Sequence, residues 1–191
     1  MHSMLKQLIA AIALAFMALT AMASELADKL KLPNHALLMR HALAPGTGDP
    51  AGYTLKDCNT QRNLDAQGRQ QATRTGQWLQ RQGIQHAMVL TSPWCRCKDT
   101  ADLLGFGQPE VEPAIGSFFE ASQEASDYTQ RLQKRLGQLG STKGDKALIL
   151  VTHHVNILDY MGSHVGSGDM VLVHFDARGK LISAKRYPSP Q

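Results

Sequence analysis

The stretch ALILVTHH, residues 147–154, does most to decide the fold of this chain. Its apolar residues run without a polar break, which is typical of a parallel strand covered on both faces. A second apolar run, Ala36 to Met39, is followed directly by Arg40 and His41. Both runs therefore predict buried strands that carry cationic or titratable side chains at their carboxyl ends.

Helical patterns separate the predicted strands. Asp65 is a candidate N-cap for a helix to about Gln82, and Ser92 with Pro93 predicts the start of a helix to about Leu104. The other expected elements are a strand at Ala87–Leu90, a short strand at Val111, a helix over Ala125–Leu139, and a hairpin of MVLVHF and LISAKRY. Alternating strands and helices predict an α/β fold, a three-layer α/β/α sandwich around a mostly parallel central sheet.

The N-terminus has the pattern of a secretory signal peptide. Lys6 precedes an apolar run from about Leu8 to Leu19, and small residues lead up to a predicted cleavage site after Ala23. We expect residues 1–23 to be removed and residues 24–191 to form one periplasmic or secreted domain. No second apolar stretch is long enough to span a bilayer, so no stable membrane anchor is expected after cleavage.

Composition narrows the choice of partners. The 191 residues carry a formal net charge of +4. This excess is mild and scattered, and no basic run is interleaved with aromatic residues, so the sequence does not predict a nucleic-acid partner.

The chain has three cysteines, Cys58, Cys95 and Cys97. In an oxidising compartment a disulfide persists, and we expect Cys58 to pair with Cys97 or Cys95. If residues 95–97 are helical, these two cysteines point to roughly opposite sides, so one of them faces Cys58. Three reduced thiols are the alternative. The sequence has no H-E-x-x-H or C-x-x-C spacing, and no metal site is predicted.

Candidate functional residues follow three of the predicted strands. Arg40 and His41 follow the first strand, Arg96 lies in the first turn of the helix after the second, and His153 and His154 follow the strand at 147–151. Ligands of open α/β sheets bind beyond the carboxyl ends of the strands. Guanidinium groups and a helix N-terminus both suit phosphate oxygens. Each residue taken alone is compatible with a structural role, but their joint placement predicts a phosphoryl site.

Four blocks of the chain resemble the histidine phosphatase superfamily, branch 1, also called phosphoglycerate mutase-like. RHA at 40–42 is similar to the family's Arg-His-Gly motif, with Ala42 in place of glycine. LDAQGRQQA at 64–72 and SPWCRCKDTA at 92–101 are similar to the next two blocks, and ALILVTHH to the strand before the family's second catalytic histidine. The resemblance implies a phosphoglycerate mutase-like fold and a compact, exported member.

The resemblance also implies chemical roles. His41 would be the nucleophile and form a phosphohistidine that water hydrolyses, while Arg40, Arg96 and His153 would surround the phosphoryl oxygens. Neither a cofactor nor a metal is implied.

The general acid that the resemblance implies is Glu120, which follows Phe118 and Phe119. We expect desolvation beside these rings to raise the pKa of its carboxyl group. Glu124 is the rival candidate.

Arg62 and His154 are further candidates for substrate binding, and the long polar segment 42–63 should shape the mouth of the pocket. Expected substrates are small phosphorylated molecules such as phosphosugars and envelope glycolipid phosphates, or phosphohistidine proteins. An alternative is a phosphate-ester-binding module of the same fold that has lost turnover. Ala42 beside the nucleophile and the unproven acid motivate this alternative.

Overall fold

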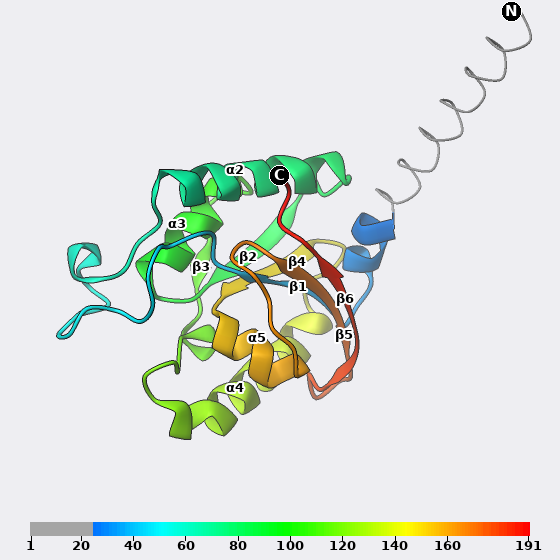
Figure 1. Cartoon of the computed structure of the whole chain (residues 1–191). Helices are drawn as coiled ribbons and strands as arrows, with labels where there is room; N and C mark the ends of the chain where they lie inside the picture. The colour runs from blue at the N-terminus through cyan, green and yellow to red at the C-terminus, as the bar shows by residue number, and fades with distance from the viewer. Residues whose placement is uncertain (1–24) are drawn as a thin grey trace, which may run out of the picture.

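The structure is a computed structural model that describes residues 25–191, so the predicted signal peptide lies outside the described residues. A six-stranded sheet in the order β3-β2-β4-β1-β5-β6 forms the middle layer (Figure 1). In chain order the strands are β1 (His35–Arg40), β2 (Ala87–Thr91), β3 (Glu110–Val111), β4 (Ala147–Thr152), β5 (Met170–Phe175) and β6 (Leu181–Tyr187). The first four strands run parallel, whereas β5 pairs antiparallel with both β1 and β6. The predicted mostly parallel sheet is confirmed.

Helices cover both faces of the sheet, which confirms the three-layer architecture (Figure 1). On one face lie α2 (Ala66–Arg81) and α3 (Cys95–Leu103), and on the other lie α4 (Ala125–Gly140) and α5 (His154–Met161). Three short 3-10 helices occur in the connections, at Cys58–Thr60, Pro113–Ile115 and Ser122–Glu124. Residues 25–31 are also helical. No helix within residues 25–191 combines the length and apolarity needed to cross a membrane.

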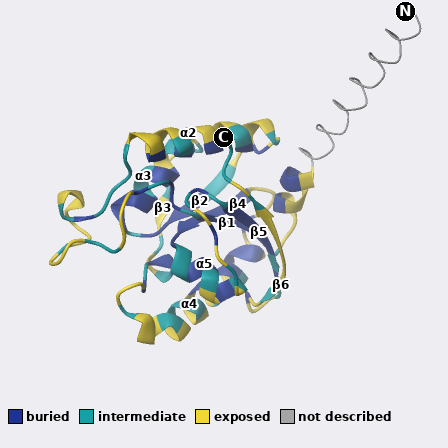
Figure 2. Cartoon of the chain, viewed as in Figure 1, coloured by how far each residue is buried: buried dark blue, intermediate teal, exposed yellow. Residues whose placement is uncertain are grey.

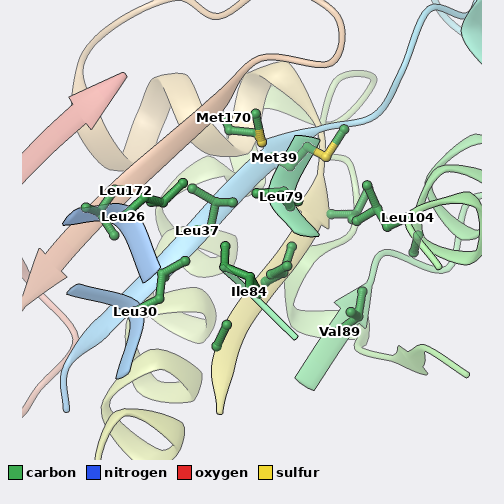
Figure 3. Packing of buried hydrophobic residues seen from close by; sticks show 14 of the residues in the cluster. Leu26, Leu30, Leu37, Met39, Leu79, Ile84, Val89, Leu104, Met170 and Leu172 are labelled. Atoms are coloured by element: carbon green, nitrogen blue, oxygen red, sulfur yellow. The ribbon is translucent and has the colours of Figure 1, made fainter. Parts of the chain in front are cut away.

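The central strands are buried on both faces because their apolar residues alternate between two cores. In β1, Leu37 and Met39 pack toward α2 and Leu79, whereas Leu38 packs in the cluster on the α4 side (Figure 3). Residues of β4 alternate in the same way, and every one of them is buried (Figure 2). Each fully buried Leu contributes about 1.5–3 kcal/mol, so this pattern fixes the position and direction of both strands.

The start of α2 is as predicted, because the Asp65 side chain accepts a hydrogen bond from the Gly68 amide at 2.7 Å. The predicted start of α3 is wrong. The helix begins at Cys95, and its N-cap residue Trp94 makes no side-chain capping bond. Ser92 instead lies with its hydroxyl 2.7 Å from Nε2 of His153, because a buried imidazole needs a hydrogen-bond partner.

Helix α2 packs very closely on the segment that follows His41. A Cβ atom on Gly68 would lie 1.9 Å from the Leu43 carbonyl oxygen. One turn later, Gln71 Oε1 accepts a hydrogen bond from the Leu43 amide at 2.8 Å, and its Nε2 donates to the Ser167 carbonyl. These contacts fix the backbone just after the candidate nucleophile.

Candidate active site

The carboxyl ends of β2, β4 and β1 are neighbours in the sheet and form one rim. Arg40 is the last residue of β1 and pairs in register with Thr152 of β4. The His41 amide donates to the Thr152 carbonyl at 2.9 Å. As a result, the His41 and His153 rings lie 5.5 Å apart with their planes at 68°.

His41 is a buried, neutral imidazole. The ring is 2% exposed, and its Nδ1 lies 2.8 Å from the Ala42 carbonyl oxygen, which can only accept. Nδ1 therefore carries the ring proton, and Nε2 keeps its lone pair. The pKa of His41 is lowered to about 3, mainly by burial and also by the nearby charges of Arg96 and Arg40, while the Ala42 hydrogen bond opposes the shift.

His153 is equally buried, at 3% exposed, and desolvation lowers its pKa well below the usual value. The Ser92 hydroxyl lies 2.7 Å from its Nε2, and the Cys97 thiol lies 3.5 Å from the same atom. Both groups can donate to that nitrogen. A neutral ring that accepts at Nε2 carries its proton on Nδ1 and offers one N–H donor.

Two guanidinium groups lie beside these rings with donors unused. Arg96, 3% exposed, donates from Nη1 to Asp49 at 2.8 and 3.1 Å, and Arg40 donates from Nη1 to the Val165 carbonyl at 3.0 Å. The Nε atoms of both arginines are buried and have no hydrogen-bond partner within residues 25–191. Buried N–H donors of a cation are costly unless paired, and the oxygens of a bound anion suit them.

Asp49 holds Arg96 and the neighbouring loop in place, although no motif in the sequence singles it out. Its side chain is 5% exposed and accepts from Arg96, from the Arg62 amide at 3.0 Å and from Trp94 Nε1 at 3.1 Å. In the sequence, an acidic residue in a loop with glycine and proline cannot be told from a solvated turn residue. Only the tertiary structure shows its hydrogen-bond partners.

The long segment 42–63 is fastened to α3. Cys58 forms a disulfide with Cys95, and Gln61 Oε1 accepts from the Cys95 amide at 2.9 Å. The Cys58–Cys95 disulfide is one of the two pairings that the sequence predicted. Cys97 is a free, buried thiol, and desolvation raises its pKa to about 12.

Arg62 stabilises the same segment by hydrogen bonds to its backbone carbonyl groups. Its Nε donates to the Gly48 carbonyl at 2.7 Å, and its Nη1 donates to the Ala44 carbonyl. Its guanidinium therefore supports the loop and also faces the site.

The rim opens into a cavity of about 370 Å³, here called the rim cavity. All seven predicted site residues line it: Arg40, His41, Arg62, Arg96, Glu120, His153 and His154. The rival acid Glu124 does so too. Further lining residues that the sequence analysis missed are Asp49, Tyr53, Trp94, Ser117 and Tyr128.

The expected desolvation of Glu120 is wrong. Phe118 turns inward and its ring lies 5.6 Å from that of Tyr128, whereas Phe119 is 52% exposed and Glu120 is also exposed. The Glu120 carboxylate lies at the edge of the rim cavity, with Oε1 3.4 Å from the Asp49 amide. Two adjacent aromatic residues do not reveal which of them turns into the core.

His154 is the first residue of α5, because β4 ends at Thr152. Its Nδ1 lies 3.2 Å from the Val165 carbonyl oxygen, and its Nε2 lies 3.0 Å from Nδ1 of His164. Within residues 25–191, no three His, Cys, Asp or Glu side chains are grouped so that they could hold a metal ion.

Comparisons with known proteins agree with this geometry. Residues 36–119 match the family model described as histidine phosphatase superfamily (branch 1). No curated protein sequence matches the chain significantly. Many solved structures share the fold.

One solved relative is the protein histidine phosphatase SixA with tungstate, at 17% identity and a TM-score of 0.55, covering 81% of this chain and 97% of that one. Another is a mycobacterial glucosyl-3-phosphoglycerate phosphatase, at 16% identity and a TM-score of 0.55, with coverages of 80% and 96%. A third is a phosphoserine phosphatase from Entamoeba histolytica with 3-phosphoglyceric acid, at 15% identity and a TM-score of 0.56, with coverages of 78% and 95%. The family-model match over residues 36–119 and the shared fold together identify the histidine phosphatase superfamily, branch 1, as the family that this chain resembles.

Proposed function

We propose that this protein is a phosphatase that hydrolyses a phosphomonoester, or a phosphohistidine, through a covalent phosphohistidine on His41. The observation that carries the proposal is a neutral imidazole with a free Nε2 lone pair, buried beside guanidinium groups with unused N–H donors. A nucleophile must be deprotonated to attack phosphorus, and burial keeps His41 in that form.

The proposed reaction has two steps. Nε2 of His41 attacks phosphorus, the bond from phosphorus to the ester oxygen breaks, and Glu120 gives a proton to the leaving oxygen. Water then attacks the phosphohistidine, Glu120 takes a proton from that water, and phosphate leaves while His41 returns to its neutral form.

Arg40, Arg96 and His153 are proposed to bind the phosphoryl oxygens, whose charge spreads in the transition state. Losing one such donor costs about 3–4 kcal/mol by analogy with an oxyanion-hole donor. Arg62 and His154 are proposed to contact the substrate farther out. This donor set supplies positive charge around the anion, so we propose no cofactor and no metal.

The related structures support small phosphorylated substrates as a class, because they include a glucosyl-3-phosphoglycerate phosphatase and a phosphoserine phosphatase. The candidate substrates are phosphosugars, envelope glycolipid phosphates and phosphohistidine proteins.

We also propose that the protein is exported after removal of residues 1–23. The Cys58–Cys95 disulfide supports an oxidising compartment. N-terminal sequencing of the mature protein should begin at Ser24, and a retained Met1 would contradict export by cleavage.

The activity is tested with p-nitrophenyl phosphate in the presence of a chelator. We expect turnover by the wild type and a loss of about a thousandfold or more in His41→Ala, since the covalent route disappears. Equal turnover by the two proteins would refute the proposal. Phosphate binding without turnover in the wild type would support the binding-module alternative.

The role of Glu120 has its own test. The p-nitrophenolate ion leaves without a proton, whereas an alkoxide needs one. Glu120→Gln should therefore lower kcat for an alkyl phosphate at least tenfold more than for p-nitrophenyl phosphate. If Glu124→Gln shows that difference instead, Glu124 is the acid.

A further inference from the structure

We propose, resting on the phosphatase function above, that the rim cavity selects phosphomonoesters whose alcohol carries a protonated amine. The inference concerns the part of the cavity that receives the leaving group. It follows from how charges and aromatic rings are distributed along the cavity wall.

The cations of the cavity gather at its phosphoryl end. Arg40, Arg62 and Arg96 line the cavity together with His41, and their charges lower the pKa of its imidazole. Within residues 25–191, no lysine and no further arginine lines the cavity. His154 also lines it, but burial lowers the pKa of its imidazole, which leaves it neutral at pH 7.

When a substrate is bound, negative charges neutralise all three arginines. Arg96 is paired with the buried carboxylate of Asp49. A phosphomonoester dianion offsets the remaining two charges. A second anionic group on the substrate would therefore find no free cation in the cavity.

The leaving-group end carries the opposite charge. Glu120 and Glu124 both line the cavity, and neither takes part in any of the ion pairs formed within residues 25–191. Both residues are exposed, so solvent weakens their field and each contributes modestly. Even so, the unpaired carboxylate of Glu124 favours a cation and disfavours an anion at this end, whereas Glu120 carries the proton that it gives to the leaving oxygen.

Aromatic rings complete this wall. Tyr53, Phe119 and Tyr128 line the cavity, whereas Trp94 belongs to the phosphoryl end, with its ring 5.1 Å from that of His153. A methyl group placed on Gly48 would meet Glu120 Oε1 at 3.7 Å and the Phe119 ring at 3.8 Å, so an acid and an aromatic face lie side by side. Carboxylates beside aromatic faces are a setting that suits an ammonium group.

The test uses three phosphomonoesters of similar size, 2-aminoethyl, 2-hydroxyethyl and carboxymethyl phosphate. We expect the wild-type kcat/KM to fall in that order, with the first about threefold above the second, as the partly screened charge of Glu124 implies. Because the three esters differ in intrinsic reactivity, the decisive quantity is the amine-to-hydroxyl ratio compared between proteins. Glu124→Gln should lower this ratio about threefold, since it removes that charge. Asp102→Asn removes the same charge from an exposed site outside the cavity and should leave the ratio unchanged.

Two results would overturn the inference while the phosphatase function stands. One is a wild-type preference for the carboxylate ester. The other is an amine-to-hydroxyl ratio that Glu124→Gln leaves unchanged, including the case in which that variant slows all three esters equally. If the wild type turns over neither these esters nor p-nitrophenyl phosphate, the proposed function itself fails and the inference falls with it.

Discussion

The carboxylate of Asp49 determines which edge of Arg96 can face a phosphoryl group. Both of its oxygens lie within 3.1 Å of Nη1 of Arg96, which leaves Nε on the other edge unpartnered. Asp49 touches no reacting atom in the proposed reaction, so it is a positioning residue that acts through Arg96. Because both side chains are buried, the pair loses little to solvent screening.

Asp49→Asn should therefore lower kcat for p-nitrophenyl phosphate about tenfold or more, since a hydrogen bond to a charged group contributes about 1.5–3 kcal/mol. KM should rise less than kcat falls, because the variant disturbs the alignment of Arg96 more than the binding of phosphate. Asp99→Asn is the matched control, since it breaks an Asp–Arg pair with Arg69 outside the rim cavity. If Asp49→Asn keeps kcat within twofold of the wild type, Asp49 does not position Arg96.

At the scale of elements, the loop 42–63 reaches the site because α2 and α3 both hold it. The disulfide ties Cys58 to the first residue of α3, and Gly68 of α2 lets the Leu43 backbone approach. The sequence predicted where these helices lie, because their patterns are local. It did not predict the true start of α3, because Ser92 bonds to His153 on another strand instead of capping its own helix.

Replacing Gly68 with alanine should destabilise the fold. The new methyl group would overlap the Leu43 carbonyl, which lies 1.9 Å from the Cβ position. Overpacking of this kind costs about 1–3 kcal/mol, and backbone on both sides leaves little room to adjust. Urea denaturation checks the loss. Gln67→Ala, exposed on the same helix, should change the free energy of unfolding by less than about 0.5 kcal/mol.

The disulfide should stabilise the protein and the loop together. It closes a segment with a sequence separation of 37 residues, for which loop closure predicts about 3–4 kcal/mol. The double variant Cys58→Ser with Cys95→Ser should lose that amount in urea denaturation. Wild type measured with dithiothreitol should match the double variant. If the double variant is as stable as the oxidised wild type, the disulfide does not stabilise the fold.

At the scale of the whole molecule, much of the site follows from the sheet. Strands β2, β4 and β1 are neighbours in the sheet, and they bring Arg96, His153 and His41 to one cavity. The apolar runs in the sequence were enough to predict that these three residues lie close together. Loop side chains were harder to place. Burial of Asp49 and exposure of Glu120 depend on how a loop without regular periodicity folds back, and no local pattern encodes that.

Burying neutral histidines makes stability depend on pH. The pKa of His41 is about 3 and that of His153 is also lowered, while both should titrate near 6.5 in the unfolded chain. Between those values the unfolded state binds protons that the folded state does not, so the free energy of unfolding falls as pH falls below about 6.5. The slope approaches about 1.4 kcal/mol per pH unit for each histidine.

Urea denaturation from pH 7.5 to pH 5 measures this slope. His41→Asn should flatten it, whereas His86→Asn, which replaces an exposed histidine, should leave it unchanged. Equal slopes in all three proteins would mean that His41 is not held neutral by burial.

Rapid-quench analysis with phosphorus-labelled p-nitrophenyl phosphate tests the covalent mechanism most directly. In the wild type we expect an acid-labile, alkali-stable phosphoryl group that forms within the first turnover and maps to His41 by peptide sequencing. His41→Ala should carry no label. Label on any other residue, or full turnover by His41→Ala, would contradict phosphoryl transfer to this imidazole.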